Sequence, residues 1–156
     1  LGGEPEVLVL VQPTSPFLLT GHIDALLDVM AEDRAARSAH TIAPCSHNSH
    51  AWNCRENVDG HARFLFREER LKARNKQEKP KLFIFGNLIA ARVDALVKGE
   101  GFYAEPSAVV EISRPYEFDL DAPEDIAIAE ALIVNGCVQL SHMHNRLSYG
   151  TKGMRL

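Results

Sequence analysis

The chain has 156 residues, of which 46% are hydrophobic and 24% are charged, and its formal net charge is −4. This composition is typical of a globular domain with enough apolar residues to fill a core of its own. The negative net charge excludes a nucleic-acid-binding protein that relies on an overall positive field. The longest apolar run of the chain is too short to span a bilayer.

The cysteines and the first residue indicate where the protein works and how much of it is present. Cys45, Cys54 and Cys137 form no CxxC pair, which favours the reducing cytoplasm over a disulfide-linked secreted protein. The chain begins with Leu1 rather than Met, and an apolar strand follows almost at once. We therefore expect the intact protein to contain a further segment before Leu1.

The first predicted element is a β-strand over Val7–Val11, a continuous run of Val and Leu. Because the run does not alternate with polar residues, it predicts a central parallel strand that is buried on both faces. The polar segment 12–16 (QPTSP) follows at the carboxyl end of this strand, where open α/β sheets bind ligands. Gln12, Thr14 and Ser15 have hydrogen-bonding groups that suit a polyhydroxylated substrate. Alternatively, the segment is only a polar turn stiffened by proline.

The next elements predict an α/β fold. Four apolar residues at helical spacing indicate an amphipathic helix: Ile23, Leu26, Leu27 and Met30. Segment 39–43 predicts the following strand, and strand–helix–strand order is typical of a βαβ unit. Further strands are expected at 82–91 and 108–112, with a short helix at 93–97 between them.

Segment 45–80 is polar and has little periodicity, and Asp59-Gly60 within it predicts a hairpin turn. Four soft or borderline metal ligands lie close together in its first part: Cys45, His47, His50 and Cys54. They could form a Zn²⁺ site in an interaction domain, although their spacing differs from the paired arrangements of zinc sites. The alternative is a polar loop on the substrate side of the protein.

The second part of this segment is a basic stretch with six cationic side chains: Arg70, Lys72, Arg74, Lys76, Lys79 and Lys81. Such a stretch could contact a carboxylate or phosphate. It could equally be a solvated face, because Glu68, Glu69 and Glu78 partly neutralise it.

Asp119 and Asp121 are candidate metal ligands. In an extended chain residues i and i+2 lie on one face, and two carboxylates there repel unless a cation lies between them. Hard oxygen ligands of this kind suit Mg²⁺. The alternative is structural: Asp121 caps the helix predicted to follow, with Glu124 completing a capping box, and Asp119 is solvated.

Taken together, three motifs resemble the acylneuraminate cytidylyltransferases, the family of CMP-sialic acid synthetases. Segment 12–16 is identical to that family's QPTSP segment, 75–83 (NKQEKPKLF) is similar to NRQDLPKVY, and 118–125 (FDLDAPED) is similar to DIDTEED. The motifs occur in the same order as in the family, and the resemblance extends from Val7 to about Ile133. It implies a Rossmann-like nucleotidyltransferase fold, a three-layer α/β sandwich.

The resemblance also implies a reaction. The family joins a nonulosonic (sialic-type) acid sugar to CTP with the help of Mg²⁺ and releases pyrophosphate. Asp119 and Asp121 would be catalytic metal ligands, and Gln12, Thr14, Ser15, Lys76 and Gln77 would bind substrate. Lys76 stands where the family has an arginine for the sugar carboxylate. Lysine keeps the charge without the bidentate fork.

The resemblance implies in addition that 1–134 is the carboxy-terminal portion of one cytidylyltransferase domain, followed by a tail at 135–156. Segment 44–80 would be a substrate-side loop and homodimerisation arm. The family's amino-terminal glycine-rich loop, which binds the triphosphate, has no counterpart here, and Leu18 replaces a common arginine. We therefore expect the intact protein to be the enzyme and this chain alone to be inactive. The alternative is a truncated or degenerate, non-catalytic module that binds sugar or forms a dimer.

Overall fold

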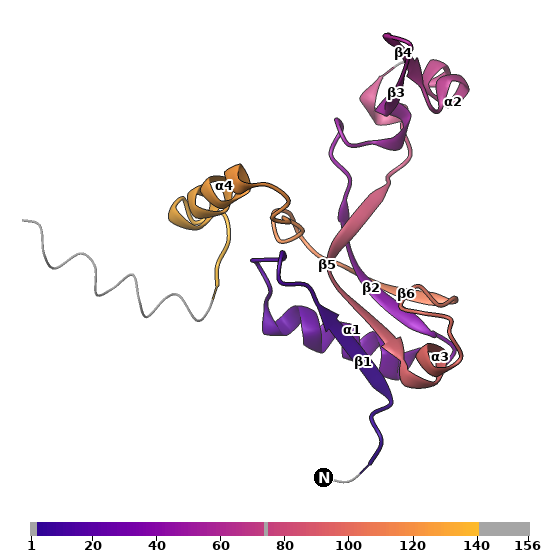
Figure 1. Cartoon of the computed structure of the whole chain (residues 1–156), viewed down its shortest axis with the longest axis vertical. Helices are drawn as coiled ribbons and strands as arrows, with labels where there is room; N and C mark the ends of the chain where they lie inside the picture. Colours follow the sequence, from indigo (N-terminus) through magenta and orange to yellow (C-terminus); the bar gives the residue numbers. More distant parts are fainter. Residues whose placement is uncertain (1–2, 74, 141–156) are drawn as a thin grey trace, which may run out of the picture. The chain divides into compact units, whose positions relative to one another are not determined.

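The computed structural model describes residues 3–73 and 75–140, which form two compact units. Unit 1 comprises 3–42 and 85–140, and unit 2 comprises 43–73 and 75–84. The elements of unit 1 are β1 (Val7–Val11), α1 (Thr20–Glu32), most of β2 (Ser38–Pro44) and of β5 (Phe83–Arg92), α3 (Val93–Val97), β6 (Ser107–Glu111) and α4 (Pro123–Val134). Figure 1 shows these elements in the colours of the sequence. The predicted strands at 39–43, 82–91 and 108–112 and the helix at 93–97 are thereby confirmed, within one or two residues at their ends.

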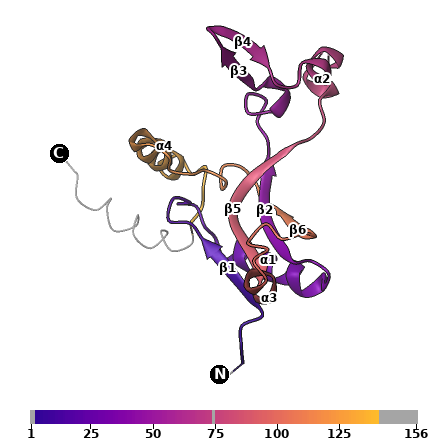
Figure 2. The same ribbon diagram turned by 45° about the vertical axis from the view of Figure 1, so that its right-hand side comes forward.

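Four strands form a mixed sheet in the order β1-β5-β2-β6, and Figure 2 shows β5 between β1 and β2. β2 and β6 are parallel, with Ser38 opposite Ser107, whereas β1 is antiparallel to β5, with Val7 opposite Arg92. The predicted α/β fold class is confirmed, although the sheet is not purely parallel.

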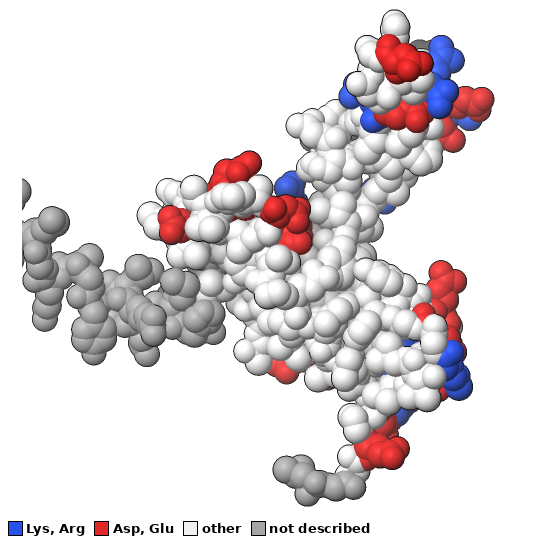
Figure 3. Space-filling model, in the orientation of Figure 1, with Lys and Arg blue, Asp and Glu red and all other residues white. Residues whose placement is uncertain are grey.

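The prediction that β1 is a central parallel strand, buried on both faces, is wrong. β1 is an edge strand in the part of the chain that the structure describes. Leu8, Leu10 and Val11 are 45%, 38% and 48% exposed. The face of the molecule in Figure 3 accordingly carries few charged side chains over β1. An unbroken apolar run indicates that a strand is hydrophobic, but it does not indicate how many other strands pair with that strand.

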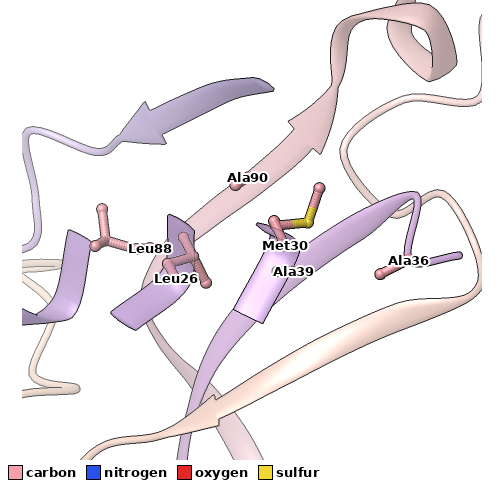
Figure 4. Packing of buried hydrophobic residues seen from close by; sticks show 6 residues of the cluster. All are labelled: Leu26, Met30, Ala36, Ala39, Leu88 and Ala90. Carbon is pink, nitrogen blue, oxygen red and sulfur yellow. The ribbon is translucent and has the colours of Figure 1, made fainter. Parts of the chain in front are cut away.

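The main core of unit 1 lies between α1 and the sheet. Leu26 and Met30, four residues apart on one side of α1, pack with Leu88 and Ala90 of β5 and Ala39 of β2. Figure 4 shows these side chains converging. Burying a Leu or Met side chain contributes about 1.5–3 kcal/mol, so this contact fixes α1 on the sheet. The predicted amphipathic helix is confirmed.

β2 and β5 approach each other closely at Gly86. A Cβ atom on Gly86 would lie 2.6 Å from Thr41 Oγ1 and 2.8 Å from the Thr41 carbonyl carbon. Real Cβ atoms do not come this close, so Gly86 is needed for the approach of the two backbones. The result places the next residue, Asn87, in the interior of unit 1.

Unit 2 contains η1 (Ala51–Asn53), β3 (Arg55–Val58), β4 (His61–Phe64), α2 (Arg67–Lys72) and η2 (Lys76–Glu78). β3 and β4 form the predicted hairpin, with Val58 opposite His61. Asp59 and Gly60 both have positive φ, 52° and 81°, as the two central residues of a type I′ turn require. The Arg55 guanidinium lies 4.3 Å from the centre of the Phe64 ring across the hairpin.

Within the two described ranges, no helix is long and apolar enough to cross a membrane.

Candidate functional site

The structure brings two of the three sequence motifs together in unit 1. The Leu120 backbone N–H donates a hydrogen bond of 2.9 Å to the Thr14 carbonyl oxygen. The 12–16 loop is itself closed by a hydrogen bond of 3.2 Å from Ser15 N–H to the Gln12 carbonyl. The loop after β1 and the Asp119–Asp121 segment are therefore neighbours, although more than a hundred residues separate them.

An apolar cluster anchors both segments from beneath. Phe17, directly after the loop, is fully buried, and its ring centroid lies 5.9 Å from that of Phe118. Leu120 packs into the same cluster, which includes Ala129 of α4. The aspartates alternate with Phe118 and Leu120 along the chain, so the apolar residues hold this segment in place.

The surroundings of Asp119 are those of a carboxylate that could bind a metal ion. The side chain is half-buried, and its Oδ1 atom is buried with no hydrogen-bond partner among the described residues. A buried carboxylate oxygen without a donor is costly unless a ligand satisfies it. Asp121, two residues on, is exposed.

The alternative role for Asp121 as a helix cap is not what the structure shows. The N-cap of α4 is Ala122. Asp125 Oδ2 accepts hydrogen bonds from the backbone N–H groups of Asp121 and Ala122, at 2.9 and 2.8 Å. Asp125 thus performs the task predicted for Glu124, which is exposed. The Asp121 carboxylate is left available for a ligand.

Glu117 is a neighbouring acidic residue that the sequence did not single out. Its Oε1 accepts a hydrogen bond of 2.6 Å from Arg114 Nε, while its Oε2 is buried and has no partner among the described residues. Glu117 lies two residues before Asp119, just as Asp119 lies two residues before Asp121. This i, i+2 spacing could have identified Glu117 from the sequence.

These residues fit Mg²⁺ as a substrate-bound ion. No three or more His, Cys, Asp or Glu side chains gather into a metal site in the described ranges. Mg²⁺ is commonly held by one or two carboxylates and completed by substrate phosphates and water. Asp119, with its orphaned Oδ1, and Asp121 provide that number of ligands.

The side chains of the 12–16 loop are also available to a ligand. Gln12, Thr14 and Ser15 are half-buried. Along the described ranges, their side chains make no hydrogen bond to another residue. The carboxamide and two hydroxyls therefore retain their donors and acceptors.

Behind this loop lies a polar hub that sequence analysis missed. Asn87 is fully buried, and its Nδ2 group lies 3.4 Å from the Phe17 carbonyl, 3.2 Å from the Tyr116 carbonyl and 2.9 Å from His22 Nδ1. Its Oδ1 accepts from Thr41 Oγ1 at 3.2 Å. One amide thus ties the exit of the 12–16 loop to α1, β2 and the chain leading to Asp119. In the sequence, this hub is marked by the polar pair Gly86-Asn87, which interrupts an apolar run.

The contact between His22 and Asn87 predicts that acid lowers the stability of the fold. Burial lowers the pKa of His22 below 6.5, and the Asn87 amide bonds the unprotonated Nδ1. Because unfolding restores the ordinary pKa of about 6.5, the unfolded chain binds more protons below that pH, and stability is lost as the pH falls. We expect the melting temperature to drop below about pH 6.5 and the drop to be smaller in His22→Gln. Burial also lowers the pKa of His40, so some dependence remains; an unchanged pH profile in His22→Gln would contradict the prediction.

The third motif lies in unit 2. Asn75 Oδ1 accepts from Gln77 N–H and Glu78 N–H at 3.0 and 3.2 Å and so begins η2. Gln77 is exposed, and Lys76 lies within η2. The other predicted site residues belong to unit 1, so the assignment of Lys76 and Gln77 to the same site remains a prediction.

The zinc interpretation is wrong. His50 uses both ring nitrogens: Nδ1 accepts from Trp52 N–H, and Nε2 lies 3.1 Å from the Pro80 carbonyl. Cys54 Sγ donates to the His50 carbonyl at 3.7 Å. No lone pair of His50 is left for a metal, because Nδ1 accepts from Trp52 N–H and Nε2 carries the proton that is donated to the Pro80 carbonyl.

Comparisons with known proteins identify the fold. No protein-family model matches the sequence, and no curated protein matches it significantly. Among solved structures, a CMP:2-keto-3-deoxy-manno-octonic acid synthetase complexed with CTP matches 86% of this chain with a TM-score of 0.57 and 16% sequence identity. The match spans 64% of that protein's chain. The two structures therefore share a mixed α/β fold, the class predicted from the sequence.

Proposed function

We propose that the protein is a cytidylyltransferase that activates an acid sugar of the nonulosonic, sialic type with CTP. The observation that carries the proposal is the hydrogen bond between Thr14 and Leu120. It sets a loop of free hydrogen-bonding groups beside two carboxylates, one with an unsatisfied buried oxygen. This pairing occurs on the fold of a synthetase whose solved structure is complexed with CTP.

In the proposed reaction, the anomeric hydroxyl of the sugar attacks the α-phosphate of CTP and pyrophosphate leaves. Gln12, Thr14 and Ser15 bind and orient the hydroxyls of the sugar. Asp119 and Asp121 hold Mg²⁺. When bound, this ion neutralises phosphate charge that the acidic segment alone would repel.

Unit 2 has two roles in this proposal. Lys76 and Gln77 bind the substrate, with the positive charge of Lys76 matched to the sugar carboxylate, and the unit serves as a homodimerisation arm. A cytoplasmic location is consistent with Cys45, Cys54 and Cys137 forming no disulfide in the described residues.

The proposal is tested by pyrophosphate release from the full-length protein, the gene product that contains this chain. We expect release with CTP, Mg²⁺ and at least one sugar from a panel of nonulosonic acids and 2-keto-3-deoxy-manno-octonic acid. Omitting the sugar is the control. If no sugar supports release although it binds, the protein is the non-catalytic sugar-binding or dimerisation module instead.

A further inference from the structure

Unit 2 contains a cavity of about 180 Å³ that the proposed reaction does not use. Its walls include Lys79, Lys81, His50 and Cys45, together with two prolines, and no Asp or Glu lines it. All lining residues belong to unit 2. The charged side chains that line the cavity are the two lysines, so the charge of its wall is positive.

Lys79 is held in the cavity wall by a neutral partner. Its Nζ atom donates a hydrogen bond of 2.6 Å to Asn53 Oδ1. In the described part of the chain, no carboxylate forms an ion pair with Lys79. An ammonium has three donors, so this contact orients the group and leaves two donors for a ligand.

Positive charge accumulates around Lys79. Burial, and then the nearby Arg70 guanidinium, lower the pKa of Lys79. Arg70 donates to the Ala73 carbonyl through Nη1, and its Nε is buried with no partner in the part of the chain that the structure describes. Like charges held together in this way are stabilised by an anion between or beside them.

The cavity does not suit a metal cation. His50 offers no lone pair, because its Nδ1 accepts from Trp52 N–H and its Nε2 faces the Pro80 carbonyl. Residues 43–84 contain nine Lys or Arg and five Asp or Glu, against a net charge of −4 for the whole chain. The local field therefore favours anions.

We propose that this cavity binds a small oxyanion, a carboxylate or phosphate group, through Lys79 and Lys81. The inference goes beyond the proposed function, since it requires neither nucleotide nor turnover. It assigns a role to the basic stretch that sequence analysis could not distinguish from a solvated face.

The test is calorimetric titration of the chain with inorganic phosphate and, separately, with acetate at constant ionic strength. We expect saturable binding of at least one of them, which also shows whether phosphate or carboxylate is preferred. Lys79→Gln should weaken binding about 10-fold, because a charge-assisted contact is lost. Lys72→Gln is the matched control: Lys72 is exposed on α2 and does not line the cavity. An equal loss in both variants, or no binding by the wild type, would overturn the proposal.

A second measurement needs no variant and remains valid if Lys79→Gln fails to fold. Cys45 lines the cavity, whereas Cys137 is exposed in unit 1. Saturating phosphate or acetate should slow alkylation of Cys45 and leave that of Cys137 unchanged, as read by mass spectrometry. Equal rates with and without both anions would contradict the site. This result is independent of pyrophosphate release, so either proposal can fail alone.

Discussion

Replacing Asp119 with Asn in the full-length protein is expected to lower the rate of pyrophosphate release by about 100- to 1000-fold, the usual cost of losing one group that stabilises transition-state charge. The Asp119 Oδ1 atom is buried and unsatisfied, and Asn places a neutral amide there. The apparent affinity for Mg²⁺ should fall together with the rate. Initial rates over a Mg²⁺ titration measure both quantities.

Two further variants separate ligand loss from general damage. Asp121→Ala should show the same coupled loss of rate and Mg²⁺ dependence. Asp24→Asn makes a comparable charge change on the exposed side of α1 and should leave both quantities unchanged. Full activity in Asp119→Asn and Asp121→Ala would remove the metal assignment, even if the transferase activity stands.

Asn87→Ala is expected to reduce the free energy of unfolding by about 3 kcal/mol, as several buried groups lose their partner and a void remains. The carbonyls of Phe17 and Tyr116 lose their shared donor. The Thr41 hydroxyl loses an acceptor but keeps the Leu88 carbonyl. Urea unfolding followed by circular dichroism measures the change. In the proposed reaction of the full-length protein, the KM for the sugar should also rise, since Phe17 positions the 12–16 loop.

Asn135→Ala provides the matched control, because Asn135 is exposed at the end of α4 and donates to Ala131. It should cost less than about 1 kcal/mol. Thr41→Val completes a double-mutant cycle with Asn87→Ala, and we expect coupling, because the two side chains share hydrogen bonds. A cost for Asn87→Ala no larger than the control would show that the hub is not needed for stability.

Local patterns in the sequence predicted most elements of the fold. Helical spacing from Ile23 to Met30 located α1, and Asp59-Gly60 located the β3–β4 hairpin. The pairing of β1 could not be predicted, because Val7–Val11 reads the same whether its neighbours are parallel or antiparallel and whether one or two strands flank it. Partner choice depends on residues distant in sequence, such as Leu88 to Arg92.

In the candidate site too, features that depend on neighbouring residues in the sequence could be predicted, and features that depend on distant residues could not. Motif resemblance selected Gln12, Thr14, Ser15, Asp119 and Asp121, and the structure places the two segments side by side. The helix cap was misassigned by one residue, because Asp121, Glu124 and Asp125 all suit the start of α4 by type, whereas Ala122 is the N-cap and Asp125 bonds its N–H. Asn87 could not be recognised, since a single Asn in an apolar run acquires its partners only after folding.

The hydrogen bond of 2.8 Å from Cys45 N–H to the Leu82 carbonyl affects which changes of length and sequence the fold can accept between these two residues. The two strands that leave and re-enter unit 1 are joined at this point, so residues 46–81 form an insertion with adjacent ends. Such an insertion can lengthen, shorten or be exchanged for a tight turn without altering the register of β2 and β5. We therefore expect β2 and β5 to tolerate sequence change within 46–81 as long as this closing hydrogen bond is kept.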